Sequence, residues 1–231
     1  MKKTTIALGL VLAAAGCGVI QPARMALPDG LQARTAESRI EGLGAGTSGT
    51  LRVAGNSGPF TRAASQLSLF EIASFDRGGS TFTVSGADFP SPVSARCRFR
   101  QNTVTLGIVD FNPKKMAYEC DFDGLPSARL SLQEAAPDGG VRTLKSARRG
   151  QISVDGAVLT LRSVHDIEGA ALPVAAPIGY VFEAGSQPVA AIELNGTVPQ
   201  LRLPDTTQPQ LRRSALLAAI AVSLLWDPAA R

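Results

Sequence analysis

The residues best suited to acid–base or metal chemistry lie together in the segment SVHDIE, residues 163–168. His165 is the only histidine of the chain, and Asp166 and Glu168 follow it. One histidine cannot complete a histidine-rich zinc site or an HExxH motif, and the chain has no G-x-S-x-G, P-loop or dinucleotide-binding motif. A Ser-His-Asp triad with distant members stays open. We therefore expect His165 to be a structural or surface residue, with no catalytic residue, metal or cofactor.

Two cysteines lie in segments with the same charge pattern. Cys97 lies in SARCRFRQ, where three arginines share one face of a strand, and Cys120 lies in MAYECDFD, where three acidic residues share one face. If Cys97 were opposite Cys120 in an antiparallel pair, opposite charges would meet on the other face: Arg96 with Asp121, and Arg98 with Glu119. We interpret these charges as a solvated wall, and we expect a disulfide, as is usual for an even number of cysteines in an exported protein.

One feature conflicts with this bond. The run Thr103–Val109 reads as a strand of its own between the two cysteine segments. A strand in between would separate the cysteines by about 9.6 Å, beyond the limit of about 7 Å for a disulfide. Either this run bends away, or the thiols meet at a strand end, or no bond forms.

A basic group is the candidate contact for lipid phosphates. Its members are Arg142, Lys145, Arg148 and Arg149, near the predicted turn ARRG. Clustered basic residues at a membrane surface attract phosphate groups. The alternative interpretation is a soluble loop with scattered charge.

The N-terminus indicates export. Lys2 and Lys3 precede an apolar run over residues 6–15, which is typical of a secretory signal peptide and too short to span a bilayer. LAAAGC, residues 12–17, resembles the lipobox of bacterial lipoproteins, with alanine at position 14 where that family usually has leucine. The resemblance implies that residues 1–16 are removed and that Cys17 is acylated, for example with palmitate. Gly18, in place of the aspartate that retains enteric lipoproteins at the inner membrane, implies the outer membrane, facing the periplasm.

The rest of the chain reads as a tether and one domain. Residues 17–46 show little periodicity, so we expect a lipid anchor and flexible tether there and a single domain over residues 47–231. The chain has 23 basic and 19 acidic residues, and without Lys2 and Lys3 the net charge is +2. This small excess, with no clustered basic footprint, indicates no nucleic-acid partner.

Short alternating runs between turn signals predict about a dozen strands. Asp155-Gly156 and Asn195-Gly196 are predicted to be two-residue type I′ hairpin loops, and Pro199 places the last strand at an edge or a bulge. The predicted strands are residues 67–75, 80–85, 94–101, 103–109, 116–123, 128–134, 141–146, 151–154, 157–164, 178–183, 189–194 and 197–203.

The chain ends in a predicted helix over residues 212–226 that has no polar face. Its run Ala215–Trp226 contains one polar residue, Ser223, and a helix that is apolar all round is normally buried on every side. A sheet of about 12 strands that closes into a barrel would have an interior about as wide as a helix. We therefore predict a mainly β fold, an antiparallel closed barrel of about 12 strands around a buried C-terminal helix. The alternative is a β-sandwich with a C-terminal helix.

This combination resembles the tubby-like fold, shared by tubby proteins, phospholipid scramblases and LURP-one-related proteins. The residues that carry the resemblance are LLAAIAV (216–222), LLWD (224–227) and the hairpin GYVFEAGSQPVAAIEL before them. Tubby domains bind phosphoinositides through basic residues that have no match here, so the resemblance implies the fold and not that activity.

Taken together, these features predict a non-enzymatic cell-envelope lipoprotein, a structural or interaction module at the periplasmic face of a membrane. Its expected partners are the membrane, through the lipid anchor, and an envelope protein or lipid. One alternative is a carrier of a lipid or other apolar ligand, which requires an open lumen. A second alternative is an envelope enzyme of unknown class.

Overall fold

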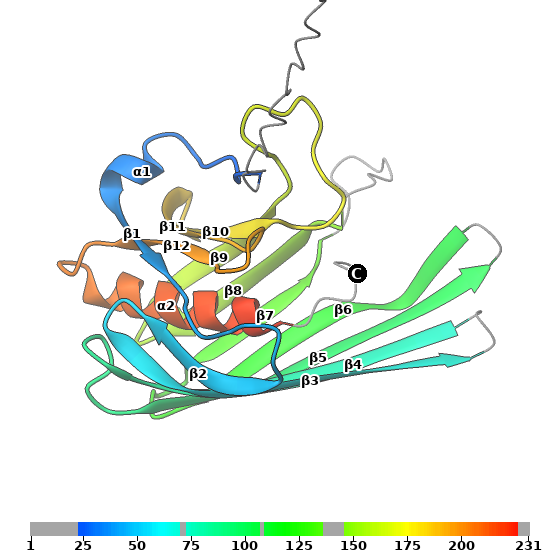
Figure 1. Ribbon diagram of the computed structural model, residues 1–231, viewed down its shortest axis with the longest axis horizontal. Helices are drawn as coiled ribbons and strands as arrows, with labels where there is room; N and C mark the ends of the chain where they lie inside the picture. Colours follow the sequence, from blue (N-terminus) through cyan, green and yellow to red (C-terminus); the bar gives the residue numbers. More distant parts are fainter. Residues whose placement is uncertain (1–22, 70–72, 107–108, 136–145, 226–231) are drawn as a thin grey trace, which may run out of the picture.

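The computed structural model describes residues 23–69, 73–106, 109–135 and 146–225. Its twelve strands form one antiparallel sheet that curls around a C-terminal helix (Figure 1). From β2 to β12 each strand pairs with its neighbour in sequence, and β1 pairs with β12. This confirms the predicted barrel of about 12 strands, because the sheet is continuous and is not split into the two layers of a sandwich.

The elements have the following bounds. The strands are β1 (Thr35–Arg39), β2 (Ser48–Val53), β3 (Asn56–Leu69), β4 (Ala73–Gly86), β5 (Val93–Leu106), β6 (Val109–Asp123), β7 (Arg129–Glu134), β8 (Arg148–Val154), β9 (Ala157–Val164), β10 (Gly179–Ala184), β11 (Gln187–Glu193) and β12 (Gln200–Pro204). The helices are α1 (Leu31–Arg34) and α2 (Pro209–Leu224).

The barrel is nearly closed, with its seam between β1 and β2. These two strands are the ends of the sheet order. One isolated bridge crosses the seam just past β1: the Glu41 N–H donates to the Arg52 carbonyl at 2.9 Å, and the Arg52 N–H donates to the Glu41 carbonyl at 3.0 Å. Some of the backbone N–H and C=O groups at the two edges of the sheet are thus hydrogen-bonded across the seam, as barrel closure requires.

Helix α2 fills the interior of the barrel. Pro209 starts the helix, a position where its missing N–H costs nothing. Every residue from Ser214 to Val222 is buried, and so is Leu224. The prediction of a helix buried on all sides is therefore confirmed. The helix begins three residues before the predicted position 212, and the predicted stop at Asp227-Pro228 lies outside the described residues.

The predicted flexible tether over residues 17–46 is wrong for most of its length. Residues 31–34 form α1 and residues 35–39 form β1, which pairs with β12. Four apolar residues of this segment are buried: Met25, Leu31, Ile40 and Leu43. They are spaced too irregularly for a strand or helix period, which is why the sequence pattern missed them.

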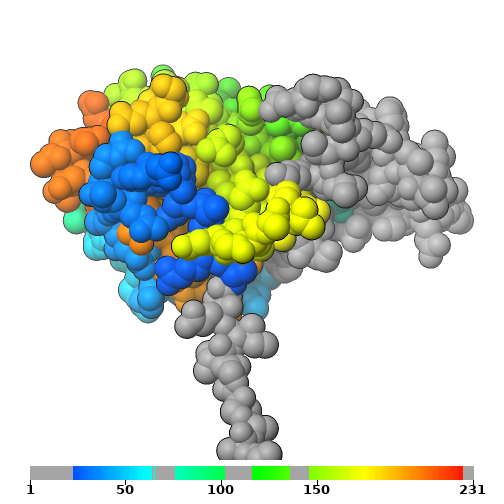
Figure 2. All heavy atoms as spheres, turned by 90° about the horizontal axis from the view of Figure 1, so that it is seen from above, coloured from blue at the N-terminus to red at the C-terminus, as the bar shows by residue number. Residues whose placement is uncertain are grey.

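The N-terminal segment covers an outer face of the barrel. Met25 pairs with Ile167 in an isolated bridge, and in the view from above the N-terminal segment lies along the loop that contains Ile167 (Figure 2). Beneath it, Leu31 and Met25 form a second small core with outer-face residues of the sheet: Val164, Ile178, Val181 and Ala191. Strand β10 is consequently buried on both faces along its first four residues.

The turns divide into confirmed and corrected predictions. Asp155 and Gly156 have φ values of 49° and 79°, so the predicted type I′ turn is confirmed, with Val154 opposite Ala157 and Ile152 opposite Leu159. Asn195-Gly196 is not a two-residue loop, because Glu193 pairs with Gln200 and the whole segment 194–199 connects β11 to β12. Strand β12 begins after Pro199 and lies between β1 and β11, so it is neither an edge strand nor a bulge.

Two predicted strands are instead the ends of long hairpins. The run 67–75 contains the end of β3 and the start of β4, and the run 103–109 contains the end of β5 and the start of β6. These four strands have 14 or 15 residues, against 5 to 8 in every other strand. Most of the predicted strand 141–146 lies outside the described residues.

Strands β3–β6 run on beyond the end of α2 (Figure 1). The Tyr118 hydroxyl donates to the carbonyl of Ala221 near the helix C-terminus, at 2.8 Å, which marks the level at which the helix ends. We call the part of the four strands past this level the extension, residues 66–69, 73–76, 101–106 and 109–115. The rest of the barrel, around α2, is the body.

Candidate functional site

The described residues include two of the four members of the predicted lipid-phosphate group, Arg148 and Arg149. Arg142 and Lys145 lie outside the described residues, as does the predicted lipidation site Cys17. Arg148 is buried, and its guanidinium donates to the Tyr180 hydroxyl at 3.3 Å. The reason is its register, because Arg148 alternates in β8 with the inward residues Ile152 and Val154. Arg149 is exposed, so Arg148 and Arg149 do not form a common basic surface.

His165 has a structural role, as predicted. It is buried, and its Nδ1 lies 3.0 Å from the Val174 carbonyl, which can only accept, so Nδ1 carries the proton. Nε2 then accepts from the Ser163 hydroxyl at 3.0 Å, and that hydroxyl accepts from the Arg148 backbone N–H at 2.8 Å. This chain of hydrogen bonds ties the loop after β9 to the start of β8. Within the described ranges, no group of three His, Cys, Asp or Glu residues could hold a metal ion.

The two cysteines lie directly opposite each other in β5 and β6 and form a disulfide, with Cα atoms 4.0 Å apart. The conflicting strand does not exist, because Thr103–Leu106 continues β5 and Val109 begins β6. The predicted register is confirmed, with Arg96 opposite Asp121 and Arg98 opposite Glu119. The ion pairs are diagonal: Arg98 to Asp121 and Arg100 to Glu119, each at 3.8 Å.

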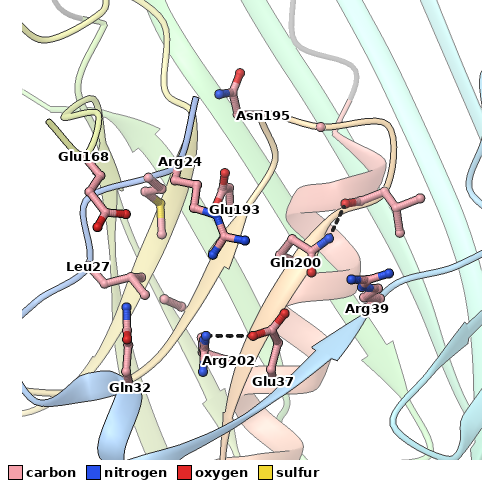
Figure 3. Close-up of a pocket in the computed structure, with 14 residues that line it drawn as sticks. Arg24, Leu27, Gln32, Glu37, Arg39, Glu168, Glu193, Asn195, Gln200 and Arg202 are labelled. Atoms are coloured by element: carbon pink, nitrogen blue, oxygen red, sulfur yellow. Dashed lines mark hydrogen bonds and ion pairs between the residues drawn. The ribbon is translucent and has the colours of Figure 1, made fainter. Parts of the chain in front are cut away.

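A polar pocket lies where the N-terminal segment crosses the outer face of β11 and β12 (Figure 3). Its volume is about 280 Å³, near the lower limit for a small-ligand site. Arg202 donates to Glu37 at 2.7 Å across it. Gln200 also lines the pocket, and its buried Oε1 atom has no hydrogen-bond partner among the residues that the structure describes. The charged residues that line the pocket are Arg24, Glu37, Arg39, Glu168, Glu193 and Arg202.

This pocket can hydrogen-bond a small polar group but does not select for one charge. Three arginines and three glutamates line it, so neither an anion nor a cation gains a net attraction from the set. No sequence motif could have found the pocket, because its lining comes from three separate parts of the chain: residues 24–39, residue 168 and residues 191–202. Gln200 and Arg202 alternate with the buried Leu201 and Leu203 in β12, which marks them as residues of the outer face but does not indicate a pocket.

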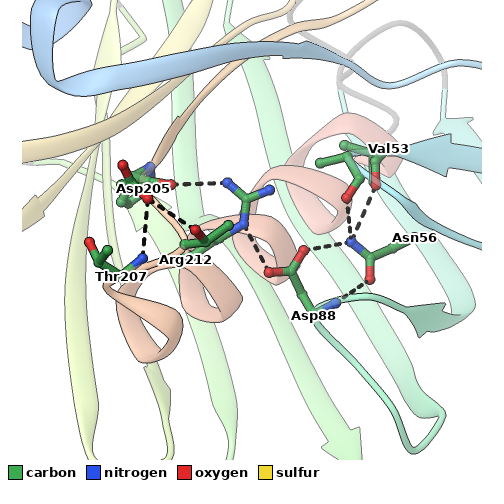
Figure 4. Close-up of polar contacts among 9 residues, drawn as sticks. Val53, Asn56, Asp88, Asp205, Thr207 and Arg212 are labelled. Carbon is green, nitrogen blue, oxygen red and sulfur yellow. Dashed lines mark hydrogen bonds and ion pairs between the residues drawn. The ribbon is translucent and has the colours of Figure 1, made fainter.

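A buried polar network fixes the start of α2 at the other end of the barrel (Figure 4). The Arg212 Nε atom donates to Asp88 Oδ1 at 2.9 Å, and both side chains are 11 % exposed. Asn56 donates to Asp88 Oδ2 at 2.8 Å and accepts from the Asp88 backbone N–H at 2.9 Å. Arg212 also donates to the Pro204 carbonyl at 3.0 Å. The network joins the β2–β3 turn, the β4–β5 loop and α2, so it positions the helix in the barrel.

The turn that leads into α2 is built around Asp205. Its carboxylate accepts from the Thr207 backbone N–H at 3.2 Å and from the Thr206 hydroxyl at 3.0 Å. These hydrogen bonds, the Thr207 N–H foremost, hold the pKa of Asp205 below its ordinary value. Asp205 therefore acts as a turn residue and not as an acid–base group.

Buried tyrosines line the opposite end of the interior, where α2 ends. Tyr118 contacts the Ser80 hydroxyl at 3.2 Å and donates to the Ala221 carbonyl. Burial raises the pKa of Tyr118 well above its ordinary value, so the hydroxyl stays protonated and keeps its donor. Tyr180 pairs with Arg148 nearby in the sheet. These polar contacts stabilise the helix terminus in an otherwise apolar interior.

Among the described residues, no helix combines the length and apolarity needed to cross a membrane. No family model, no curated protein and no solved structure matches the chain.

Proposed function

We propose that the protein is a lipoprotein of the cell envelope, anchored through Cys17, whose barrel is a non-enzymatic structural or interaction module at the periplasmic face of the outer membrane. The anchor rests on the resemblance of residues 12–17 to a lipobox. The module rests on one observation, the burial of α2 in the barrel. Residues Ala215–Ala221 are all 0 % exposed, so the interior is packed with the chain's own side chains.

This packing supports a module over a carrier. A carrier of an apolar ligand requires a lumen, and binding pockets for such ligands measure about 300–1,000 Å³. To open that volume, α2 would have to leave the barrel and expose its apolar surface on every side. The part-buried Arg212–Asp88 pair at the N-terminus of α2 and the Tyr118–Ala221 hydrogen bond near its C-terminus both oppose such a movement.

The experiment is to replace Cys17 by serine and fractionate the cells. The wild-type chain should carry the mass of its acyl chains and stay with the membrane after a wash with alkaline carbonate, which removes peripheral proteins. The Cys17→Ser chain should lack the acyl mass and be washed off. A Cys97→Ser/Cys120→Ser double variant is the matched control, because it loses cysteines but keeps the anchor. An unacylated wild-type chain contradicts the proposal.

A further inference from the structure

The charged side chains of the polar pocket on β11 and β12 are only partly paired with one another. Arg202 and Glu37 form an ion pair at 2.7 Å. Among the residues that the structure describes, the side chains of Arg39 and Glu193 form no ion pair and no hydrogen bond. The pocket therefore presents unpaired charges of both signs.

Three of the lining residues form one row across the sheet. Arg39 of β1 lies directly opposite Gln200 of β12, and Gln200 lies directly opposite Glu193 of β11. Residues paired in this way point to the same face of a sheet. Because neighbouring strands are about 4.8 Å apart, the backbones of Arg39 and Glu193 are about 9.6 Å apart, with Gln200 between them. The row thus has a cation at one end and an anion at the other.

The middle residue of the row supplies a buried acceptor. Gln200 Nε2 donates to the Val198 carbonyl at 3.4 Å, and this contact fixes the orientation of the amide, because the opposite orientation would bring two acceptors together. The Oε1 atom is buried and has no hydrogen-bond partner in the described part of the chain. A buried acceptor without a donor is unfavourable. A ligand that donates a hydrogen bond here would satisfy it.

Small residues leave a hollow beside this row. On the same face of β11, two residues before Glu193, lies Ala191, and Gly179 of β10 lies opposite Glu193. Met25 of the N-terminal segment packs directly on Gly179, where a Cβ atom would overlap its sulfur. Ala191 and Met25 are 1 % and 2 % exposed, and both line the pocket. The floor of the hollow is therefore apolar.

The N-terminal segment forms the other wall of the pocket. Figure 3 shows Arg24 and Leu27 of this segment on one side and Gln200 and Arg39 of the sheet on the other. The segment is held in place by the Met25–Ile167 bridge. With a volume of about 280 Å³, the pocket suits a ligand at the small end of the usual range.

A zwitterion fits these features better than a ligand with a single charge. An anion at Arg39 would leave the Gln200 acceptor and Glu193 without a cation, and a cation at Glu193 would leave Arg39 without an anion. Side chains stand roughly perpendicular to a sheet, so the charged ends of the row keep about the separation of their strands. Two hydrogen bonds of about 2.9 Å each use about 5.8 Å of the 9.6 Å across two strand spacings. About 4 Å then remains between the two charged groups of the ligand.

This remaining distance is the scale of an α-amino acid, in which one carbon atom joins the ammonium and the carboxylate. The ammonium has three donors, so it can bind Glu193 and the Gln200 Oε1 atom at the same time. The guanidinium of Arg39 can bind the carboxylate in a bidentate pair. The side chain of the amino acid would then lie over Ala191.

We propose that this pocket binds a free α-amino acid with a small apolar side chain. Its carboxylate lies at Arg39, its ammonium lies between Gln200 Oε1 and Glu193, and its side chain lies on the floor of Ala191 and Met25. The site would add ligand binding to the interaction module proposed above, and it does not depend on the Cys17 anchor.

The test is isothermal titration calorimetry of the full-length protein with racemic alanine, valine and leucine, so that either enantiomer can bind. At least one of them should bind with a Kd of about 1 mM or lower, which is within the affinity that so few atoms can provide. The N-acetyl form of the same amino acid lacks the ammonium, and its amide form lacks the carboxylate. Each form should bind at least tenfold more weakly than the amino acid.

Variants of the row assign each contact. Arg39→Gln should weaken binding of the amino acid at least tenfold and should change binding of its amide form less than twofold. Glu193→Gln should do the same for the amino acid and its N-acetyl form. Gln200→Leu should weaken binding of the amino acid and of the amide form, because both keep the ammonium. Arg52→Gln is the matched control, since Arg52 is 65 % exposed and lies outside this pocket, and it should change binding less than twofold.

Several outcomes would overturn the amino-acid site and leave the Cys17 anchor standing. One is that none of the three amino acids binds. Another is that the amide form binds as tightly as the amino acid, which would make this a site for an amine, or that the N-acetyl form does so, which would make it a site for a carboxylate. A third is that Arg39→Gln and Glu193→Gln bind the amino acid as tightly as the wild-type chain. Thermal unfolding of each variant verifies that the chains are folded.

Discussion

The body and the extension of β3–β6 are built from the same four strands, yet only the body surrounds α2. In the body the inner row Cys97–Cys120 lies in the core with α2, and the outer row Arg96–Asp121 faces water. In the extension the strands stay paired, with Ser74 opposite Thr103 and Ala73 opposite Val104, and the register between β5 and β6 shifts twice. Strand pairing is a property of neighbouring backbones and persists past the helix, whereas the burial pattern of the body is set by its contact with α2.

The largest expected loss of stability comes from a charge placed in the buried helix, and a charge on the exposed wall of the barrel is the comparison. Ile220 is 0 % exposed in the middle of α2, so Ile220→Asp places an unpaired charge in the core and should prevent folding. Ile220→Val is the matched control and should cost about 1 kcal/mol. Val158→Asp, at a position of β9 that is 45 % exposed, should leave the protein folded. Urea unfolding followed by circular dichroism checks all three. A folded Ile220→Asp chain would mean that α2 does not fill the barrel.

The burial of α2 was predictable from the same feature that makes the fold sensitive to a charge in this helix. Its run from Ala215 to Trp226 has no polar face, so the sequence alone required a surrounding partner, and twelve strands supply it. The register of Cys97 with Cys120 was predictable because charges and sulfurs alternate with the strand period. The turn Asp155-Gly156 was predictable because both residues adopt positive φ.

Other parts could not be predicted, for reasons that the structure explains. The ends of the long hairpins lie between Leu69 and Ala73 and between Leu106 and Val109, where the sequence has no type I′ turn pair, so each end read as one continuous strand. Residues 23–46 contribute isolated apolar residues to two cores, without a local period. Arg148 read as a surface charge because its partner, Tyr180, is 32 residues away. The polar pocket is assembled from segments that no motif connects.

The next effect tests how α2 is held in the body. Arg212→Ala leaves the largely buried Asp88 side chain, 11 % exposed, without its cation and should cost about 3 kcal/mol of unfolding free energy. The exposed pair Arg52–Glu41, with side chains 65 % and 59 % exposed, provides the control. Arg52→Ala should cost less than about 1 kcal/mol. Equal losses in chemical denaturation would show that the Arg212 network does not secure the helix.

The disulfide stabilises the wall of the body opposite α2. It closes a loop with a sequence separation of 23, which predicts about 3 kcal/mol of stabilisation in the chain-entropy model. Unfolding with and without reductant measures it, and a Cys97→Ala/Cys120→Ala variant should not respond to reductant. Two thiols that react in denaturant without reductant would show that the bond does not form in the exported protein.

A smaller effect is expected where the body gives way to the extension. Tyr118→Phe removes the donor to the Ala221 carbonyl and leaves that buried carbonyl unsatisfied, at a cost of about 1–2 kcal/mol. Ser80→Ala removes the longer contact at 3.2 Å and leaves the Tyr118–Ala221 bond in place, so it should cost less. A Ser80→Ala loss as large as that of Tyr118→Phe would mean that the helix end is not held by the tyrosine.

The smallest effect is expected at an exposed leucine, and it sharpens the comparison because the residue type is the same. Leu130 is 0 % exposed in β7, and Leu130→Ala should cost about 2–5 kcal/mol. Leu172 lies in the loop between β9 and β10 and is 80 % exposed, so Leu172→Ala should change stability by less than about 0.5 kcal/mol. Denaturant unfolding of both variants gives the difference. A large loss of stability for Leu172→Ala would mean that this loop packs against the barrel.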